Sequence, residues 1–511
     1  MRSPLHFLSI LAAAAAVSLS AVAAPSTPHP KSQFIDNGEN ADENDAETRA
    51  NPKMDDEPSD AYNAPRRYSF INTDANRIIM NGHSWENLTR KFDMAADGRA
   101  TVSVVHIGDS HLQPDGSSGR VRRYLQKAYG NAGRGLMIPY RVAGTNQPLD
   151  YRISTSSPVT SAKLMRMPWP TMMGFTGIAV HPDVSSPSFS LKGPEPFREL
   201  RVYADREVEL SSATANGQKV QFIWHPMHWG GIAVFPHPVN DLSLSFNSRG
   251  ATFYGFDSRR LPSANISAES EDDASEVRNP GVVYHSIGNN GAAYSSYSSI
   301  GNYGEKIAPL KPDLAIIALG TNEAFGRTSD AAMYSQIDRL VSEVRRENPG
   351  CEILLVTPSE CQRSVYTTKR TGRRRRRTSR IRSYAVNENV ARMRNIILRY
   401  GREKSVPVYD FYEVAGGKGS SAKWLSNRLL SSDRIHRTWN GYYLEGDLLY
   451  AAIANALGQS ELRLPSLAPT PVVDRAKVKP STRRLKSSKY KSKKSSRKAS
   501  RSSKPRKSSR R

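Results

Sequence analysis

Residues 101–107 form the stretch that most constrains the fold of this chain. Their sequence, TVSVVHI, is rich in β-branched residues, which is typical of a strand buried on both faces of a sheet. The turn Gly108-Asp109-Ser110 follows, and a helix is expected near Ser118–Tyr129. Strands of this kind belong to parallel sheets covered by helices, so the chain is expected to have an α/β fold.

The alternation of strands and helices resumes after residue 280. Four more strands are predicted at Gly281–Ile287, Asp313–Leu319, Glu352–Thr357 and Val406–Tyr409. Three more helices are predicted at Ala331–Arg346, Ala385–Tyr400 and Tyr442–Leu457. Such an alternation favours parallel strands with helices on both faces of the sheet.

The stretch 150–278 interrupts this pattern. Turn residues separate short β-type runs in it, which are Gly177–His181, Ser188–Leu191, Glu199–Tyr203, Val220–Trp224, Leu242–Phe246 and Thr252–Phe256. This spacing favours a β-sandwich or jelly roll. We expect an α/β domain in two parts, 62–149 and 279–460, around this inserted β-domain, because a surface loop whose ends lie close together tolerates an insertion.

The N-terminal end of the chain has the composition of a targeting segment, and the C-terminal end has that of a polar tail. Arg2 and the apolar run 7–22, followed by small residues, predict a signal peptide over 1–24; the run is short for a membrane anchor. An acidic linker over 25–61 and a basic tail over 461–511 are expected to be disordered. The mature protein is expected in the periplasm or cell envelope, without a transmembrane segment.

The formal net charge of +25 is concentrated in two stretches. Residues 475–511 contain eighteen Lys and Arg, and residues 369–382 contain nine more; neither has an acidic residue, so the rest of the chain nets −2. A nucleic-acid-binding domain more often carries its charge on a folded face, so nucleic acid is not expected as a partner. The tail and the basic loop 368–382, with its block Arg373–Arg377, are expected to be solvated. Both are compatible with binding an anionic envelope polymer or lipid.

The number and positions of the cysteines do not decide whether the chain contains a disulfide bond. The chain has only Cys351 and Cys361. The first opens a predicted strand and the second lies in the loop beyond it. A bridge and two free thiols are both compatible with the sequence.

Ser110 is the first candidate for chemistry, in the segment GDSH directly after the first strand. Functional loops of parallel sheets lie at the carboxyl ends of the strands. The N–H groups at a helix N-terminus favour negative charge, which suits a nucleophile whose attack creates an oxyanion. A serine that only caps the helix is the alternative.

Asp433 and His436 precede the last predicted helix. Their spacing allows the carboxylate to orient the imidazole, and a serine hydroxyl needs such a base because it is not acidic enough alone. Gly291 and Asn322 follow two predicted strands, and with the N–H of Ser110 they are candidates for an oxyanion hole. Each segment alone is also an ordinary turn.

Together, the four segments resemble the blocks of the SGNH (GDSL) hydrolase superfamily, which carry Ser, Gly, Asn and His, with Asp three residues before His. Here they read GDSH, GNNGA, GTNE and DRIH, and the resemblance covers 101–140 and 281–457. It implies a flavodoxin-like three-layer core without metal or organic cofactor. The roles that it implies are a catalytic triad of Ser110, Asp433 and His436 and an oxyanion hole of Ser110, Gly291 and Asn322.

Two positions depart from the common pattern. His111 replaces the Leu of GDSL, and Glu323 replaces the Asp of GxND. Neither position is catalytic in the family, so activity is still expected. Gly288 competes with Gly291 for the place in the oxyanion hole.

The sequences GDSH, GTNEAF and DxIHxTxxGYxxxG, with a β-domain inserted after the first block, look like those of bacterial peptidoglycan O-acetylesterases. In that family the inserted domain resembles a carbohydrate-binding module. The resemblance implies removal of acetyl groups from the 6-hydroxyl of N-acetylmuramic acid in the cell-wall polysaccharide. Two alternatives stay open: an SGNH esterase, lipase or O-acetyltransferase on another acyl substrate, and a non-catalytic envelope-binding protein. The complete residue set argues against the second.

The segment WHPMHWG in the expected β-domain is rich in aromatic residues. Trp224 and Trp229 are candidates for stacking on a sugar ring. A metal site at His225 and His228 would lack a nearby carboxylate or cysteine, so none is predicted. A packed aromatic corner of the β-domain is the alternative, and the more ordinary one.

Overall fold

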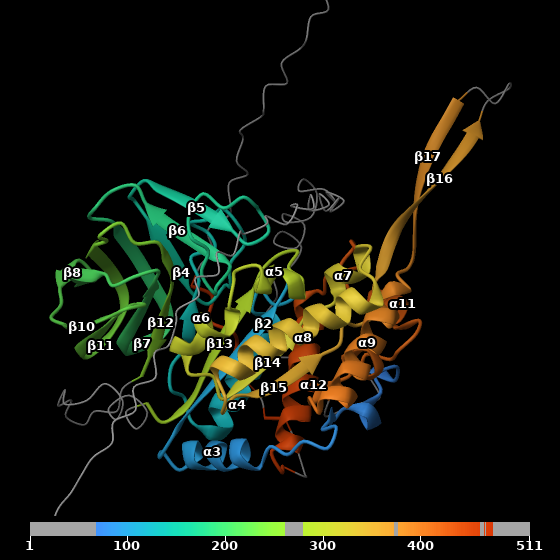
Figure 1. The fold of residues 1–511 in the computed structure, drawn as a ribbon, viewed down its shortest axis with the longest axis horizontal. Helices are drawn as coiled ribbons and strands as arrows, with labels where there is room; N and C mark the ends of the chain where they lie inside the picture. Colours follow the sequence, from blue (N-terminus) through green and yellow to red (C-terminus); the bar gives the residue numbers. More distant parts are fainter. Residues whose placement is uncertain (1–67, 261–278, 372–376, 460–463, 466, 474–511) are drawn as a thin grey trace, which may run out of the picture.

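The computed structural model describes residues 68–260, 279–371, 377–459, 464–465 and 467–473 (Figure 1). The predicted signal peptide, the acidic linker and the tail beyond residue 473 lie outside these ranges. Six strands form the central sheet, in the order β1 (Ile78–Ile79), β18 (Val408–Tyr409), β15 (Glu352–Val356), β14 (Leu314–Ala318), β2 (Thr101–Gly108) and β13 (Gly281–Gly288). Neighbours are parallel, except that β1 pairs antiparallel with β18. All five predicted strands are present, in the 2-1-3-4-5 order of a flavodoxin-like sheet.

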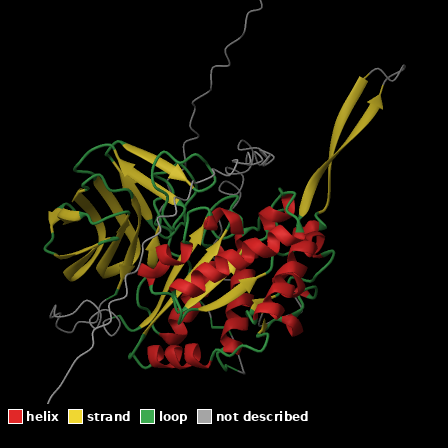
Figure 2. Cartoon of the chain, viewed as in Figure 1, coloured by secondary structure: helices red, strands yellow, loops and turns green. Residues whose placement is uncertain are grey.

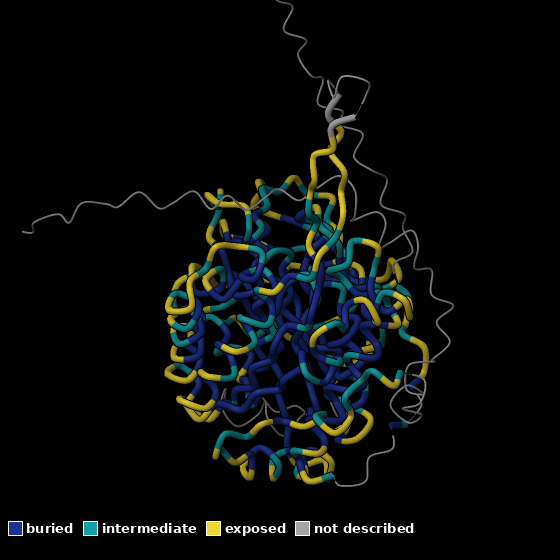
Figure 3. Tube along the Cα trace, turned by 90° about the vertical axis from the view of Figure 1, so that its right-hand side faces the viewer, coloured by how far each residue is buried: buried dark blue, intermediate teal, exposed yellow. Residues whose placement is uncertain are grey.

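Helices cover both faces of this sheet and give three layers (Figures 1 and 2). Side chains alternate along β2, so that Val102 and Val104 join one apolar core while Val105 and Ile107 join the other. The first core is completed by α3 (Glu86–Ala96), α4 (Gly116–Tyr129) and α12 (Trp439–Ala456). The second core is completed by α5 (Tyr294–Ser298), α6 (Tyr303–Ile307), α8 (Asp330–Glu347) and α9 (Asn389–Lys404). Both β2 and β13 are buried along their whole length, as their composition predicts. Figure 3 shows the buried interior of the molecule, with the exposed residues at its periphery.

Short helices complete the α/β unit between these elements. They are α7 (Thr321–Phe325), α10 (Phe411–Val414) and α11 (Ser420–Ser426), with 3-10 turns at Thr73–Ala75 and Ala308–Leu310. Of these, α7 directly follows β14 and begins with the GTNE segment. It therefore places this segment at the carboxyl edge of the sheet.

The described residues of the basic stretch 368–382, for which the sequence predicts a solvated loop, belong to a two-stranded hairpin instead. β16 (Gln362–Thr371) pairs along its whole length with β17 (Arg377–Val386), and the hairpin projects from the body (Figures 1 and 3). The helix expected from Ala385 consequently begins at Asn389, because the preceding residues end β17. Composition suggested a loop, but hydrogen bonds between the strands satisfy this backbone. Residues 372–376, with most of the arginine block, lie outside the described ranges.

The second unit is a ten-stranded antiparallel sheet, which agrees with the predicted inserted β-domain. Its two long strands are β7 (Ser188–Ala204) and β11 (Gly230–Asn247), which pair with each other. The others are β3 (Gly135–Met137), β4 (Arg152–Thr155), β5 (Val159–Lys163), β6 (Ile178–Pro182), β8 (Glu209–Ala215), β9 (Gln218–Lys219), β10 (Ile223–Met227) and β12 (Phe253–Arg259). The sheet thus includes β3, which precedes residue 150.

Both long strands change partners along their length. The two runs expected at Ser188–Leu191 and Glu199–Tyr203 are the two ends of β7; the first end pairs with β4 and the second with β12. Prolines at positions 194, 196, 236 and 238 stand between the halves of β7 and β11, where they cannot donate to the ladder. Each strand therefore continues through an irregular middle instead of ending there.

A loop of the β-domain docks on the turn that follows β13. Asn289 Nδ2 donates to the carbonyl of Thr176 at 3.0 Å, and the Tyr303 hydroxyl donates to the carbonyl of Phe175 at 2.9 Å. A Cβ on Gly177, whose φ is 72°, would lie 2.3 Å from Asn289 Nδ2. Only glycine permits this approach, which fixes the β-domain beside the carboxyl edge of the central sheet.

Candidate active site

Ser110 stands in the turn between β2 and α4, at the carboxyl edge of the sheet. Its Oγ lies 2.8 Å from Nε2 of His436. The turn is tight, because a Cβ on Gly108 would come within 2.9 Å of the Leu112 Cβ. The glycine of GDSH therefore lets the chain fold back over the strand that it has just left.

Asp433 holds the far side of the His436 ring. Its Oδ2 lies 2.6 Å from His436 Nδ1, while its Oδ1 accepts hydrogen bonds from the N–H groups of Ile435 at 2.9 Å and His436 at 3.0 Å. The loop closes through Arg434, which adopts a φ of 65°, in the left-handed region. A line of hydrogen bonds therefore joins carboxylate, imidazole and the hydroxyl of Ser110, as the sequence predicts.

The electrostatics of this line favour a basic imidazole. Burial acts to lower the pKa of His436, but the hydrogen bond and charge of Asp433 outweigh it and raise the pKa above the ordinary 6.5. Burial acts to raise the pKa of Asp433, but the hydrogen bond and charge of His436 keep it below the ordinary 3.8. Asp433 is thus ionised at neutral pH and holds the proton of Nδ1, which leaves Nε2 to accept a proton from Ser110.

Asn322 links the Ser110 turn to the Gly291 turn. Its Nδ2 donates to Asp109 Oδ2 at 3.2 Å and to the carbonyl of Ala292 at 2.9 Å. Asp109 precedes Ser110 and Ala292 follows Gly291, so the three predicted donors meet at one edge of the sheet. No described residue accepts a hydrogen bond from the N–H of Ser110 or of Gly291. Both N–H groups are thus free of partners within the described chain and can receive an oxyanion. The Asn322 amide has both of its N–H bonds engaged, so it can donate to an oxyanion only by exchanging Asp109 or Ala292 for it.

The structure separates the two competing glycines. The N–H of Gly288 donates to the Tyr140 hydroxyl at 3.2 Å, so this donor is engaged in the core. Gly291 instead has a φ of 82°, which favours glycine, and a Cβ there would meet Met165 Cγ at 3.7 Å. Met165 belongs to the β-domain, which therefore reaches the edge of the site.

The sequence analysis did not assign a role to the polar residues that lie beside the hydrogen-bonded line of Asp433, His436 and Ser110. Arg437 Nη1 lies 2.7 Å from His111 Nδ1, and its Nη2 donates to Ser359 Oγ at 2.8 Å. Asp109 is buried, and burial raises its pKa to about 6. Their positions in the sequence could have pointed to these residues, because Asp109 and His111 flank Ser110 and Arg437 follows His436.

The two tryptophans predicted to bind a sugar pack on the β-domain core. Trp224 Nε1 donates to the carbonyl of Val208 at 3.1 Å, and the ring centroid lies 6.4 Å from that of Phe246. The ring of Trp229 lies 5.0 Å from that of Tyr203. Both tryptophans are half-buried, which corresponds to the packed aromatic corner rather than to an open platform.

Three features concern metals, thiols and membranes. Among the described residues, no group of three or more His, Cys, Asp or Glu is placed to hold a metal ion. Cys351 and Cys361 are buried free thiols. In the same part of the chain, no helix combines the length and apolar character that a bilayer crossing requires.

Comparison with known families identifies the second part of the α/β unit. Residues 270–444 match the model of the GDSL-like lipase/acylhydrolase family. This stretch includes Gly291, Asn322, Asp433 and His436. Ser110 lies before it, in the turn after β2, the strand that the fold places between β13 and β14. A search of curated proteins found no match.

Solved structures resemble the fold. One, described as "Peptidoglycan O-acetylesterase in action", has a TM-score of 0.57 at 19% identity and covers 74% of this chain and 97% of that chain. A lipase/acylhydrolase from Enterococcus faecalis (TM-score 0.25, 18% identity, 36% of this chain, 80% of that chain) and an acetyl xylan esterase (0.26, 14%, 34% and 81%) are more distant. The first likeness shows an SGNH hydrolase fold. With the match of residues 270–444 to the GDSL-like lipase/acylhydrolase family, it supports carboxylic-ester hydrolase activity on this fold.

Proposed function

We propose that this chain is an exported serine esterase that removes O-acetyl groups from a cell-envelope polysaccharide, and that its substrate is the 6-O-acetyl ester of N-acetylmuramic acid in peptidoglycan. One observation carries the proposal: the hydrogen-bonded line from Asp433 through His436 to Ser110, beside two N–H groups at the sheet edge that have no partner among the described residues. The signal-peptide pattern over 1–24 supports export to the compartment that holds such a polymer.

The choice of polymer draws on the similar structure described as a peptidoglycan O-acetylesterase. The likeness covers 97% of that chain and 74% of this one, which is more than the two α/β parts supply. The β-domain is therefore part of the similarity. Its Met165, beside Gly291, supports the idea that the β-domain shapes the site that receives the sugar.

The proposed mechanism proceeds through an acyl-enzyme. Ser110 Oγ attacks the acetyl carbonyl carbon while its proton passes to His436 Nε2. The N–H groups of Ser110 and Gly291, with the Asn322 amide, stabilise the oxyanion that forms. When the intermediate collapses, the C–O bond to the sugar breaks and His436 returns the proton to the leaving alkoxide.

Hydrolysis of the acyl-enzyme repeats these steps with water. Water adds to the acetyl carbonyl as His436 takes its proton, and acetate leaves as Ser110 regains a proton from His436. Asp433 keeps the imidazole oriented and stabilises its positive charge in both halves. The reaction balances without metal, reductant or organic cofactor.

Acetate release from purified polymers tests the proposal. We expect release from O-acetylated peptidoglycan to exceed that from acetylated xylan, and turnover of a long-chain 4-nitrophenyl ester to be slow. Ser110→Ala should lower acetate release by about 10³-fold or more. Wild-type activity in Ser110→Ala would refute the nucleophile, while a preference for xylan, for the long-chain ester or for acetyl transfer to another hydroxyl would refute the substrate.

A further inference from the structure

The hairpin β16–β17 has no role in the chemistry described above. Residues 361–386 contain ten Lys and Arg and no acidic residue. Four of these side chains, Arg363, Lys369, Arg380 and Arg382, are exposed, and none forms an ion pair with a described residue. A two-stranded hairpin is marginally stable by itself, and like charges lower its stability further. Binding of an anionic partner would therefore stabilise this arm.

The strand register sorts the side chains of the hairpin onto two faces. One face, called here the tyrosine face, carries Ser364, Tyr366, Thr368, Arg380, Arg382 and Tyr384. The opposite face carries Arg363, Val365, Thr367, Lys369, Ile381 and Ser383. Each face thus has two exposed cations with described side chains, but the two tyrosines are on one face only.

On the tyrosine face, each exposed arginine side chain lies against a tyrosine ring. The guanidinium carbon of Arg380 lies 3.8 Å from the ring centroid of Tyr366, and that of Arg382 lies 4.9 Å from that of Tyr384. Arg382 Nε also donates to Ser364 Oγ at 2.9 Å. These contacts hold the guanidinium groups in place, so that less side-chain entropy is lost when a ligand binds.

This row continues into the loop that holds Asp433 and His436. The guanidinium of Arg434 lies 3.9 Å from the ring centroid of Tyr384, and its Nη1 donates to Gln362 Oε1 at 2.8 Å. The carbonyl of Arg434 accepts a hydrogen bond from the Gln362 N–H at 3.0 Å. The tyrosine face therefore leads from the arm to the residue between the carboxylate and the imidazole.

We propose that the tyrosine face is a docking surface for an acidic polysaccharide, the polymer whose ester reaches Ser110; this rests on the proposed function. A tyrosine ring offers a flat apolar surface on which a sugar ring stacks, and Tyr366 is 49% exposed. Guanidinium groups bind carboxylate or phosphate groups of the same polymer through paired hydrogen bonds. Duplex nucleic acid or an anionic lipid surface requires only positive charge, for which the two faces would serve equally.

Paired variants of the full chain test the surface. In a Ser110→Ala background, which binds without turnover, Arg380→Gln/Arg382→Gln is compared with Arg363→Gln/Lys369→Gln, which removes the same charge from the opposite face. Tyr366→Ala is compared with Ile381→Ala, since Ile381 is 44% exposed on that opposite face. The basic tail is present in every variant, so its contribution cancels.

Affinity for polygalacturonate, a soluble polysaccharide of carboxylate-bearing sugars, is the first readout. We expect both tyrosine-face variants to weaken binding by about tenfold and both opposite-face variants by less than about twofold. Equal effects on the two faces would overturn the proposal. It would also be overturned if single-stranded DNA or phosphatidylglycerol vesicles bound more tightly than polygalacturonate and depended in the same way on Tyr366.

Catalysis by chains with Ser110 intact is the second readout. The ratio of kcat/KM for acetate release from O-acetylated peptidoglycan to kcat/KM for 4-nitrophenyl acetate should fall about tenfold in the tyrosine-face variants. An unchanged ratio would contradict a role in presenting the polymer. If the chain released no acetate at all, the proposed function would fail, whereas polygalacturonate binding would still decide whether the arm recognises acidic glycans.

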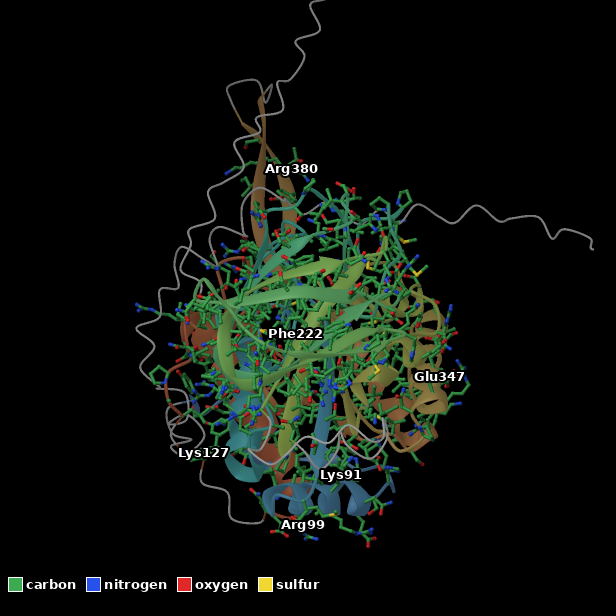
Figure 4. All side chains as sticks on the ribbon, turned by 90° about the vertical axis from the view of Figure 1, so that its left-hand side faces the viewer. Lys91, Arg99, Lys127, Phe222, Glu347 and Arg380 are labelled. Carbon is green, nitrogen blue, oxygen red and sulfur yellow. The ribbon has the colours of Figure 1, made fainter. Side chains whose placement is uncertain are left out.

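Position on the molecule provides a last control. Arg380 lies on the projecting arm, whereas Arg99 lies at the opposite end of the molecule (Figure 4). Arg99→Gln should leave the affinity for polygalacturonate unchanged, whereas Arg380→Gln alone should lower it. Equal losses of affinity in these two single variants would overturn the proposal, because they would show that overall charge governs binding.

Discussion

The imidazole ring of His111 lies against that of His436, with ring centroids 5.2 Å apart and planes inclined by 42°. Burial lowers the pKa of His111 well below the ordinary 6.5, and the positive charge of Arg437 adds to this effect. The Arg437 guanidinium donates a hydrogen bond to Nδ1 of His111. The proton of the neutral ring is therefore on Nε2. The two adjacent histidines therefore have opposite tendencies, and only His436 is poised to gain a proton.

Replacing His111 by leucine, the residue of the common GDSL pattern, should affect stability more than titration. A buried N–H of Arg437 would lose its acceptor, which costs about 1–3 kcal/mol of unfolding free energy. Because the lost ring is neutral, the pH midpoint of kcat/KM should move by less than about 0.3 unit. Urea unfolding and a pH–rate profile measure the two effects. A midpoint shift of about one unit would show that His111 carries charge.

The activity should rise with pH as His436 loses its proton, because only the neutral imidazole accepts the proton of Ser110. Since Asp433 raises the pKa of His436, the midpoint of this rise should lie above the ordinary 6.5. Asp433→Asn should lower kcat by about 10⁴-fold, because an amide favours the wrong tautomer of the ring. The profile of kcat/KM against pH checks the first expectation; a midpoint below 6.5 would contradict it.

Asn322→Ala should lower kcat by about 10²- to 10³-fold, because it removes a donor that stabilises charge developed in the transition state. KM should change much less, since the ground-state ester carries no oxyanion. Steady-state kinetics with 4-nitrophenyl acetate separates the two constants. Asn427→Ala, at an exposed position, is the control. A kcat of Asn322→Ala within about twofold of the wild type would exclude Asn322 from the oxyanion hole.

Glu323 should make the fold less stable at alkaline pH. Burial raises its pKa from 4.5 to about 7; Oε1 accepts from the Tyr294 N–H, but Oε2 has no partner among the described residues. Since the folded chain binds this proton more tightly than the unfolded chain, stability falls as pH rises from 4.5 to about 7. Above that range the ionised carboxylate costs up to about 3 kcal/mol.

Glu323→Gln removes this charge with little change in shape. The variant should be more stable than the wild type at pH 8, and the difference should shrink at pH 5. Urea unfolding at both pH values measures it. A difference that does not depend on pH would show that the Glu323 carboxyl titrates normally.

The sequence by itself determined the five parallel strands and their alternation with helices. A strand buried on both faces must be apolar at nearly every position, so TVSVVHI and its counterparts are recognisable without knowing their partners. The candidate site was predictable for the same reason. Ser110, Gly291 and Asn322 each follow a strand, and the carboxyl ends of parallel strands meet at one edge of the sheet.

Tertiary structure decided what depends on contacts between distant segments. The basic stretch forms β16 and β17 only because each strand satisfies the backbone of the other, whereas its composition is equally that of a solvated loop. Likewise, Gly288 and Gly291 are equivalent as sequence until Tyr140 engages the N–H of Gly288. Local periodicity reports burial, but the partner of each donor is set by how the chain packs.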